Sequence, residues 1–226
     1  MRYRAWALVM AAGAGLSVGP AAARAVDPDL RRLIADVPEA RDPGAATPYF
    51  ARRVPLTVYP AMVAVYADPA PRAGVRPDVR AALDRAGLRD ALTTPSSVPG
   101  WTYVMLPERA RTPESAARSV ALLAAETDMA SLVYLGEDGL PVVPTRDLLI
   151  AFEPGVTDAE QAAVLAAHGA VVTERDAAGT PGLVRAYVPA RTGDAALAAA
   201  LAANDHPSVA WAQPDRIFWA KRAGGA

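Results

Sequence analysis

The sequence of 226 residues contains no cysteine, only two histidines and a single lysine. The absence of cysteine excludes a disulfide scaffold, a thiolate zinc site, an iron–sulfur cluster and a cysteine nucleophile. His168 and His206 are too few for a histidine-rich metal site, so we expect no metal and no cofactor. A formal charge of −1 provides no basic field for a polyphosphate backbone, which argues against nucleic acid as the partner.

Bulky apolar side chains are also scarce. Aromatic residues make up 6% of the chain, whereas 53 residues are alanine. Apolar burial contributes about 25 cal/mol per Å², and an alanine methyl group buries little area. Each helix therefore contributes less to stability than its apolar pattern indicates, and we expect modest intrinsic stability.

The first 25 residues have the layout of a secretory signal peptide. Two arginines precede an apolar run from Ala5 to Val18, and a Gly-Pro break leads to Ala23 and Ala25, the small residues before the expected cleavage point. The apolar run is too short to span a bilayer comfortably, although a retained anchor is the alternative. Cleavage would change the formal charge to −4. We expect a periplasmic or secreted protein with no membrane segment in its mature form.

An internal repeat organises the rest of the chain. At an offset of 82 residues Leu83 corresponds to Leu165, and Gly87 corresponds to Gly169. After a five-residue gap, an offset of 77 aligns the last strand of each copy. Each copy has the pattern strand, helix, strand, strand, helix, strand. Right-handed crossovers then place both helices on one face of a four-stranded antiparallel sheet. The predicted fold is α+β, with two tandem ferredoxin-like (split β-α-β) units.

The expected elements follow from apolar periodicity and from helix start and stop signals. Asp158 is the expected N-cap of one helix, with Gln161 three residues later. The second strand of the first copy is weak, because LRDALTTPSSVPG has mostly loop composition. The strands are expected at 60–67, 101–107, 130–136, 147–153, 170–175, 182–188 and 207–213, and the helices at 77–86, 113–127, 158–169 and 194–204.

These elements divide the chain into six segments. The segments are a signal peptide (1–25), an N-terminal arm (26–55), a divergent first unit (56–136), a linker (137–146), a second unit (147–216) and a C-terminal tail (217–226).

One face of each predicted sheet is left without helices. The third strand of each unit places its larger and more mixed side chains on that face, and exposed aromatic patches of this kind are typical interaction surfaces. The alternative is that the two sheets cover each other. The side chains in question are Trp101, Tyr103 and Met105 in the first unit and Leu183, Arg185 and Tyr187 in the second.

The second unit resembles the prodomain of subtilisin-family serine proteases. The resemblance rests on LLIAFEPGVTDAEQAAVLAAHGAVV, then LVRAYVP, an alanine-leucine helix and SVAWAQPD, over residues 147–216. The closing QPDRIFW and the order of signal, divergent unit and prodomain-like unit resemble the separately encoded external chaperones of secreted kexin-like bacterial serine proteases. The resemblance implies that the open sheet face docks on the protease and that the tail enters its substrate cleft. The partner is then helped to fold and held inactive.

Residues of the last strand and tail carry most of the implied contacts. Polar groups at the end of the fourth strand would cap helix N-termini on the protease; here Gln213 replaces one member of the usual acidic pair. Lys221-Arg222 is a dibasic pair that a kexin-like protease would accept, although a solvated basic end is the alternative. The bulky apolar residues of the tail either fill pockets of the partner or fold back onto this chain's own sheet. The candidate partner-binding residues are Leu183, Arg185, Tyr187, Trp211, Gln213, Asp215, Ile217, Phe218, Trp219, Lys221 and Arg222.

Two other functions remain as alternatives. A periplasmic module could bind a small ligand between its two ferredoxin-like units. An enzyme would need a titratable cluster that the sequence does not reveal. His168 lies beside a helix-ending glycine and is expected to be a helix C-cap, and His206 has no acid partner in sequence. We therefore expect no catalytic residues.

Overall fold

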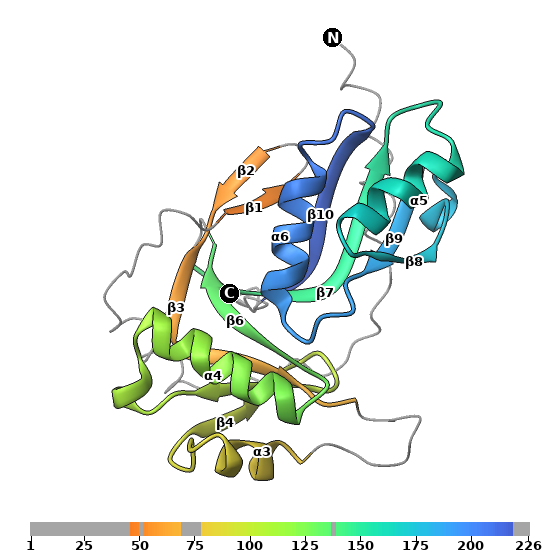
Figure 1. Ribbon diagram of the computed structural model, residues 1–226. Helices are drawn as coiled ribbons and strands as arrows, with labels where there is room; N and C mark the ends of the chain where they lie inside the picture. The colour runs from red at the N-terminus through yellow and green to blue at the C-terminus, as the bar shows by residue number, and fades with distance from the viewer. Residues whose placement is uncertain (1–45, 50–51, 69–77, 137–138, 219–226) are drawn as a thin grey trace, which may run out of the picture.

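The computed structural model describes residues 46–49, 52–68, 78–136 and 139–218. Within these residues the fold is α+β with four α-helices and antiparallel strands, as the sequence predicted, but the strands form one eight-stranded sheet rather than two separate four-stranded sheets (Figure 1). A separate hairpin of β1 (Ala46–Tyr49) and β2 (Arg52–Pro55) lies in the segment expected to be an arm.

The first half of the chain supplies four strands in the order β4-β5-β3-β6, each antiparallel to its neighbours. The predicted ranges agree with the structure to within three residues at each end. The remaining strand, β4, lies in the stretch of loop composition. The elements are β3 (Thr57–Tyr66), α3 (Val79–Arg85), β4 (Leu92–Pro95), β5 (Trp101–Met105), the 3-10 turn η1 (Glu108–Ala110), α4 (Pro113–Glu126) and β6 (Met129–Leu135).

The second half repeats this arrangement with the strand order β8-β9-β7-β10. Its first and last strands are longer than predicted, because β7 begins six residues earlier and β10 ends five residues later. The elements are β7 (Pro141–Phe152), α5 (Asp158–Ala167), β8 (Val171–Glu174), the 3-10 turn η2 (Ala177–Gly179), β9 (Leu183–Tyr187), α6 (Gly193–Ala203) and β10 (Val209–Phe218).

The end of the first helix has the same geometry in both halves. Gly87 and Gly169 follow α3 and α5 with φ angles of +73° and +66°, in the left-handed region that favours glycine. The amide after each glycine donates to the carbonyl of Leu83 or Leu165, at 2.8 and 2.9 Å. Both leucines are fully buried. The aligned residues of the repeat thus make matching structural contacts.

The N-cap of α5 differs from the sequence prediction by one residue. Thr157, not Asp158, is the cap, and it forms a capping box with Glu160. Both Thr and Asp suit a cap, but only Thr157 has a glutamate three residues later to bond back to its amide. Gln161 instead accepts a hydrogen bond from Arg175 at 2.9 Å.

Residues 141–146 belong to β7, although the sequence analysis assigned 137–146 to a linker. Pro141 and Pro144 gave this stretch the composition of a linker. Proline is nevertheless compatible with the first position of a strand and with irregular pairing. Pro141 opens β7, and Pro144 lies next to the register shift between β7 and β10.

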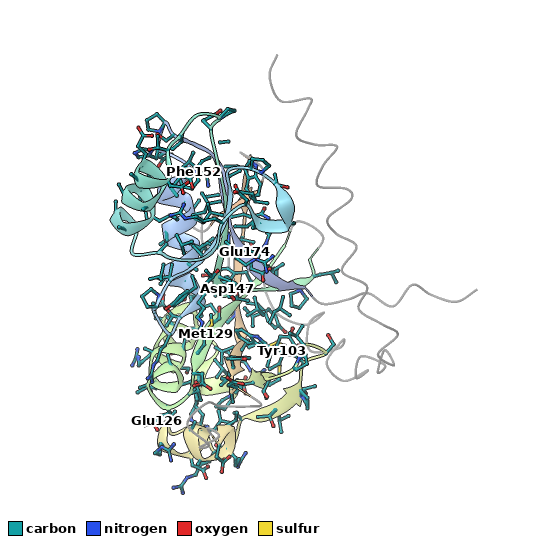
Figure 2. All side chains as sticks on the ribbon, turned by 90° about the vertical axis from the view of Figure 1, so that its right-hand side faces the viewer. Tyr103, Glu126, Met129, Asp147, Phe152 and Glu174 are labelled. Atoms are coloured by element: carbon teal, nitrogen blue, oxygen red, sulfur yellow. The ribbon has the colours of Figure 1, made fainter. Side chains whose placement is uncertain are left out.

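Strand β7 is shared by the two halves. One of its edges pairs with β6 near Val142 and with β9 over 147–151, while the other edge pairs with β10 over 142–152. The two four-stranded arrangements are therefore parts of one continuous sheet. Figure 2 shows the helices gathered on one side of that sheet.

Helix α6 packs against both halves, on the side of the sheet that carries the helices. Leu197 is part of the core of the first half, and Leu201 packs against it. The Tyr134 hydroxyl of β6 donates to Asp194 Oδ1 at 2.5 Å. Burial raises the pKa of Asp194, and this effect outweighs the Tyr134 hydrogen bond, which lowers it.

The first residue of α6 fills the space where β6 and β7 diverge. A Cβ atom on Gly193 would overlap the Pro144 carbonyl and the Ser131 hydroxyl, so only glycine fits. Just before it, the Arg191 carbonyl accepts from the Ala130 amide at 2.9 Å. The joint between the halves is thus closely packed.

Candidate docking face

The sheet face without helices in the second half brings together six of the candidate residues. On β7, Leu148 and Ile150 point into the core beneath α5 and α6, so the residues between them point to the opposite face. Their partners in the pairing register share that face. Asp215 lies at the register shift between Pro214 and Arg216 and is included because its carboxylate is near enough to Asp147 to raise the pKa of that group. We call this set the second-half open face; it comprises Asp147, Leu149, Ala151, Leu183, Arg185, Tyr187, Trp211, Gln213 and Asp215.

An irregularity in β10 determines where Trp211 lies. The register with β7 shifts between Val209 and Trp211. Val209 and Ala212 are both in the helix-side core, and Trp211 packs with the opposite cluster around Ala151 and Leu183. The shift therefore moves the indole away from the helices.

The second-half open face is mixed in burial and polarity. Leu183 is buried and Trp211, Leu149 and Tyr187 are partly buried, whereas Arg185 is exposed. A partly buried apolar centre with exposed charges around it is the composition of many interaction surfaces.

Charged side chains cluster near the joint end of this face. Arg146 lies over the Tyr187 ring, with its guanidinium carbon 5.7 Å from the centroid. Asp147 is half-buried, and burial, followed by the nearby Asp215 carboxylate, raises its pKa. Arg185 pairs with Glu174 of the edge strand at 3.7 Å.

Gln213 is the polar residue with an unsatisfied group. Its Oε1 is buried and has no hydrogen-bond partner within the described part of the chain. A buried amide oxygen without a partner costs about 1–3 kcal/mol, so a donor supplied from outside would be favourable. The sequence analysis had selected this residue as a contact to the partner.

Ile217 does not lie on an exposed surface, which corrects its selection as a partner-binding residue. It is 6% exposed and belongs to the apolar cluster of the first half. The chain thus follows the stated alternative, in which the start of the tail folds back onto its own sheet. Phe218 ends β10, but its side chain is outside the described residues, as are Trp219, Lys221, Arg222, Ala23 and Ala25.

The helix-free face of the first half is also different from expectation. Trp101, Tyr103 and Met105 lie on the face opposite α3 and α4, as predicted, but they are buried rather than exposed. We call this the first-half open face because it faces away from α3 and α4, although its side chains are buried. These side chains form one apolar cluster that also includes residues of β7 and β10. Its members are Tyr59, Ala61, Met62, Ala64, Trp101, Tyr103, Met105, Met129, Val133, Val143 and Ile217.

Both histidines make local contacts. His168 caps the C-terminus of α5, as predicted, and His206 Nδ1 accepts from the Ser208 amide at 3.2 Å. Among the described residues no group of three or more His, Asp or Glu side chains is placed to hold a metal ion. The helices in the same part of the chain include none that is long and apolar enough to cross a membrane.

Arg146, Asp147 and Glu174 were absent from the sequence-based selection of site residues. The alternation of Asp147, Leu149 and Ala151 along β7 is the signal that would have placed Asp147 on the open face. No local pattern identifies Arg146 or Glu174, because their contacts depend on the pairing of strands distant in sequence.

Comparison with family models, with curated proteins and with solved structures finds no match to this chain. The likeness to subtilisin-family prodomains therefore rests on the quoted residues.

Proposed function

We propose that this chain is a non-catalytic external chaperone and inhibitor of an exported subtilisin/kexin-like serine protease. In this proposal each half is a ferredoxin-like unit, and the two units are fused through β7. The order of elements and the strand order, which is the same in both halves, support the tandem assignment. The signal-like segment 1–25 supports export to the periplasm or beyond.

The observation that carries the proposal is the second-half open face. The six residues selected from the prodomain-like motifs of β9 and β10 share one face that no described helix covers. The face combines Trp211 and Tyr187 with Arg185 and Asp215, residue types that suit a protein partner. It also holds the Gln213 oxygen that lacks a partner.

Mass action supplies the chaperone effect. A protein that binds only the folded protease lowers the free energy of that state by RT ln(1 + [L]/Kd), about 2.7 kcal/mol at one hundred times Kd. The same binding blocks the substrate cleft if the tail with Lys221 and Arg222 lies in it as an extended strand. One surface then serves folding and inhibition.

A small ligand between the halves was the second candidate from the sequence. The described joint is filled by Gly193, by the Tyr134–Asp194 hydrogen bond and by Leu197. No observation of the described residues favours that alternative.

Co-expression tests the proposal. A signal-bearing subtilisin-like protease that lacks its own prodomain, taken from the same genome, is expressed with and without this chain and assayed on a dibasic peptide. We expect active protease only from co-expressing cells, and inhibition when purified chain is added back. Equal protease yield without the chain, together with no inhibition, would overturn the proposal.

Paired variants locate the contact. Arg185→Ala and Trp211→Ala remove side chains of the second-half open face and should each weaken inhibition at least about tenfold, as expected for central interface residues. Arg118→Ala and Leu122→Ala remove exposed side chains of α4 on the opposite side and serve as controls. Equal losses in both pairs would reject this face as the docking surface.

A further inference from the structure

The last strand passes from the second half into the first. After the register shift between Pro214 and Arg216, β10 continues along β7 with Ile217 opposite Val143 and Phe218 opposite Val142. The other edge of β7 pairs with β6 at the same place, Val142 facing Tyr134. The end of β10 therefore lies where the sheet joins the first half.

The side chain of Ile217 belongs to the first half in packing as well. It is buried in the first-half open face. Trp211 lies on the same helix-free side of β10 but packs with Ala151 and Leu183 of the second half. The helix-free side of the strand thus contacts the second half at Trp211 and the first half at Ile217. Neither the repeat nor the prodomain-like motif requires this contact.

We infer that the first half anchors the root of the C-terminal tail by holding Ile217 in its apolar open face, which fixes the position of the end of β10. This assigns a role to the first half. The consequence for inhibition rests on the proposed function, but the anchoring itself does not.

An ordered root lowers the entropic cost of binding through the tail. A tail whose root is already ordered loses less conformational entropy when it binds than one that is free from residue 214 onwards. Because the halves are fixed at Gly193 and Asp194, the root is also fixed relative to the second-half open face.

Hydrogen exchange tests the anchor without any protease. In the full chain, Ile217→Ala should accelerate amide exchange over 216–218 at least about tenfold, because the main apolar contact of this segment is lost. Val209→Ala is the matched control: it truncates a β-branched residue of the same strand that is buried to a similar extent, 7% against 6% exposed. Unchanged exchange at 216–218 in Ile217→Ala, or the same increase in both variants, would overturn the anchor.

Two further variants distinguish loss of the anchor from general unfolding. Ile217→Val keeps most of the contact and should restore slow exchange at 216–218. Val133→Ala removes a member of the same cluster from β6, in the first half, and should accelerate exchange at the end of β10. An effect of Val133→Ala confined to β6 would contradict anchoring by the first half.

Inhibition of the co-expressed protease tests the consequence. Ile217→Ala should raise the inhibition constant at least about tenfold, and Val209→Ala less than about threefold. Faster exchange with unchanged inhibition would separate the anchor from inhibition and reject the second step. If the unaltered chain does not inhibit, the proposed function fails, while the exchange measurements still decide the anchor.

Discussion

The two halves share their order of elements, their strand order and their helix-ending turns, but their helix-free faces differ in burial and polarity. At the repeat offset of 82 residues, Tyr103 of β5 corresponds to Arg185 of β9. Tyr103 is 4% exposed within an apolar cluster, whereas the Arg185 side chain is 52% exposed beside Glu174. The same position in the same topology is thus internal in one half and at the surface in the other.

The two halves show that the same strand order does not determine whether a sheet face is buried or exposed. In the first half, Ile217 and Val143 from the second half join the apolar side chains of β3, β5 and β6. In the second half, the corresponding positions carry charged and amphipathic groups. Such side chains tolerate solvent and offer specific contacts to a partner. The two halves therefore differ in the side chains of these faces while their strand order is the same.

We expect the largest loss of stability from a substitution that disrupts the joint between the two halves. Gly193→Ala should lower the free energy of unfolding by about 4 kcal/mol, because the new methyl group overlaps the Pro144 backbone, which cannot move without disturbing β7. Thr192→Ala is the neighbouring control, since Thr192 makes no side-chain cap bond. Urea denaturation measures both. A loss below about 1 kcal/mol in Gly193→Ala would mean that the joint adapts easily.

Tyr103 of β5 and Arg185 of β9 occupy matching positions but should contribute differently to stability. Tyr103→Ala should cost about 3 kcal/mol, as truncation of a buried aromatic side chain does. Arg185→Ala should change stability by no more than about 0.5 kcal/mol, because its side chain is largely in water. Thermal and urea unfolding of both variants provide the measurement. Similar losses in the two would show that the faces are equivalent.

Truncation of the shared helix tests whether the halves unfold as one. Leu197→Ala should cost about 2 kcal/mol and leave a single transition, because α6 contributes to the core of each half. Far-ultraviolet circular dichroism and tryptophan fluorescence should give coincident curves. Ala198→Ser, on the exposed side of α6, is the control and should have little effect. Two separate transitions in Leu197→Ala would contradict a shared core.

The smallest expected effect is on the pH dependence of stability, through Asp194. The pKa of Asp194 is raised in the folded state, so the folded protein holds this proton where the unfolded chain releases it. Its contribution to stability is present below the unfolded pKa of about 4 and is lost as pH rises through the folded pKa. Asp194→Asn should remove this slope, which urea titrations at successive pH values would measure.

Glu160 provides the opposite case for comparison. Its hydrogen bonds with Thr157 lower its pKa, so its contribution is present above the unfolded pKa and is lost as pH falls through the folded pKa. Glu160→Gln should therefore flatten the acid side of the profile and leave the neutral side unchanged. If the loss of stability with rising pH predicted for Asp194 persists unchanged in Asp194→Asn, another group is responsible for it.

Local patterns predicted much of the fold. Alternating apolar residues identified β5 and β9, and caps and glycines located the helices to within a few residues. The same alternation predicted which side of β9 faces away from the helices. These features depend on neighbours in sequence, which is why they could be derived from the chain alone.

Contacts between the halves could not be derived in this way. The apolar face of α6 was evident from Leu197 and Leu201, but nothing local indicates that it enters the core of the other half. The loop-like composition of Pro141 and Pro144 hid the start of β7, and the sequence did not decide whether Ile217 fills a pocket of the partner or folds back onto its own sheet. Two members of the first-half open face, Val143 and Ile217, come from these long-range placements.

The position of Leu197 also has a consequence for the order of events during synthesis. The first half ends at Leu135, yet its core is complete only when a residue some sixty positions later becomes available. A chain made from its N-terminus would hold an unfinished apolar surface until α6 emerges, and such surfaces favour aggregation. The first half is thus first in sequence and among the last parts to finish folding.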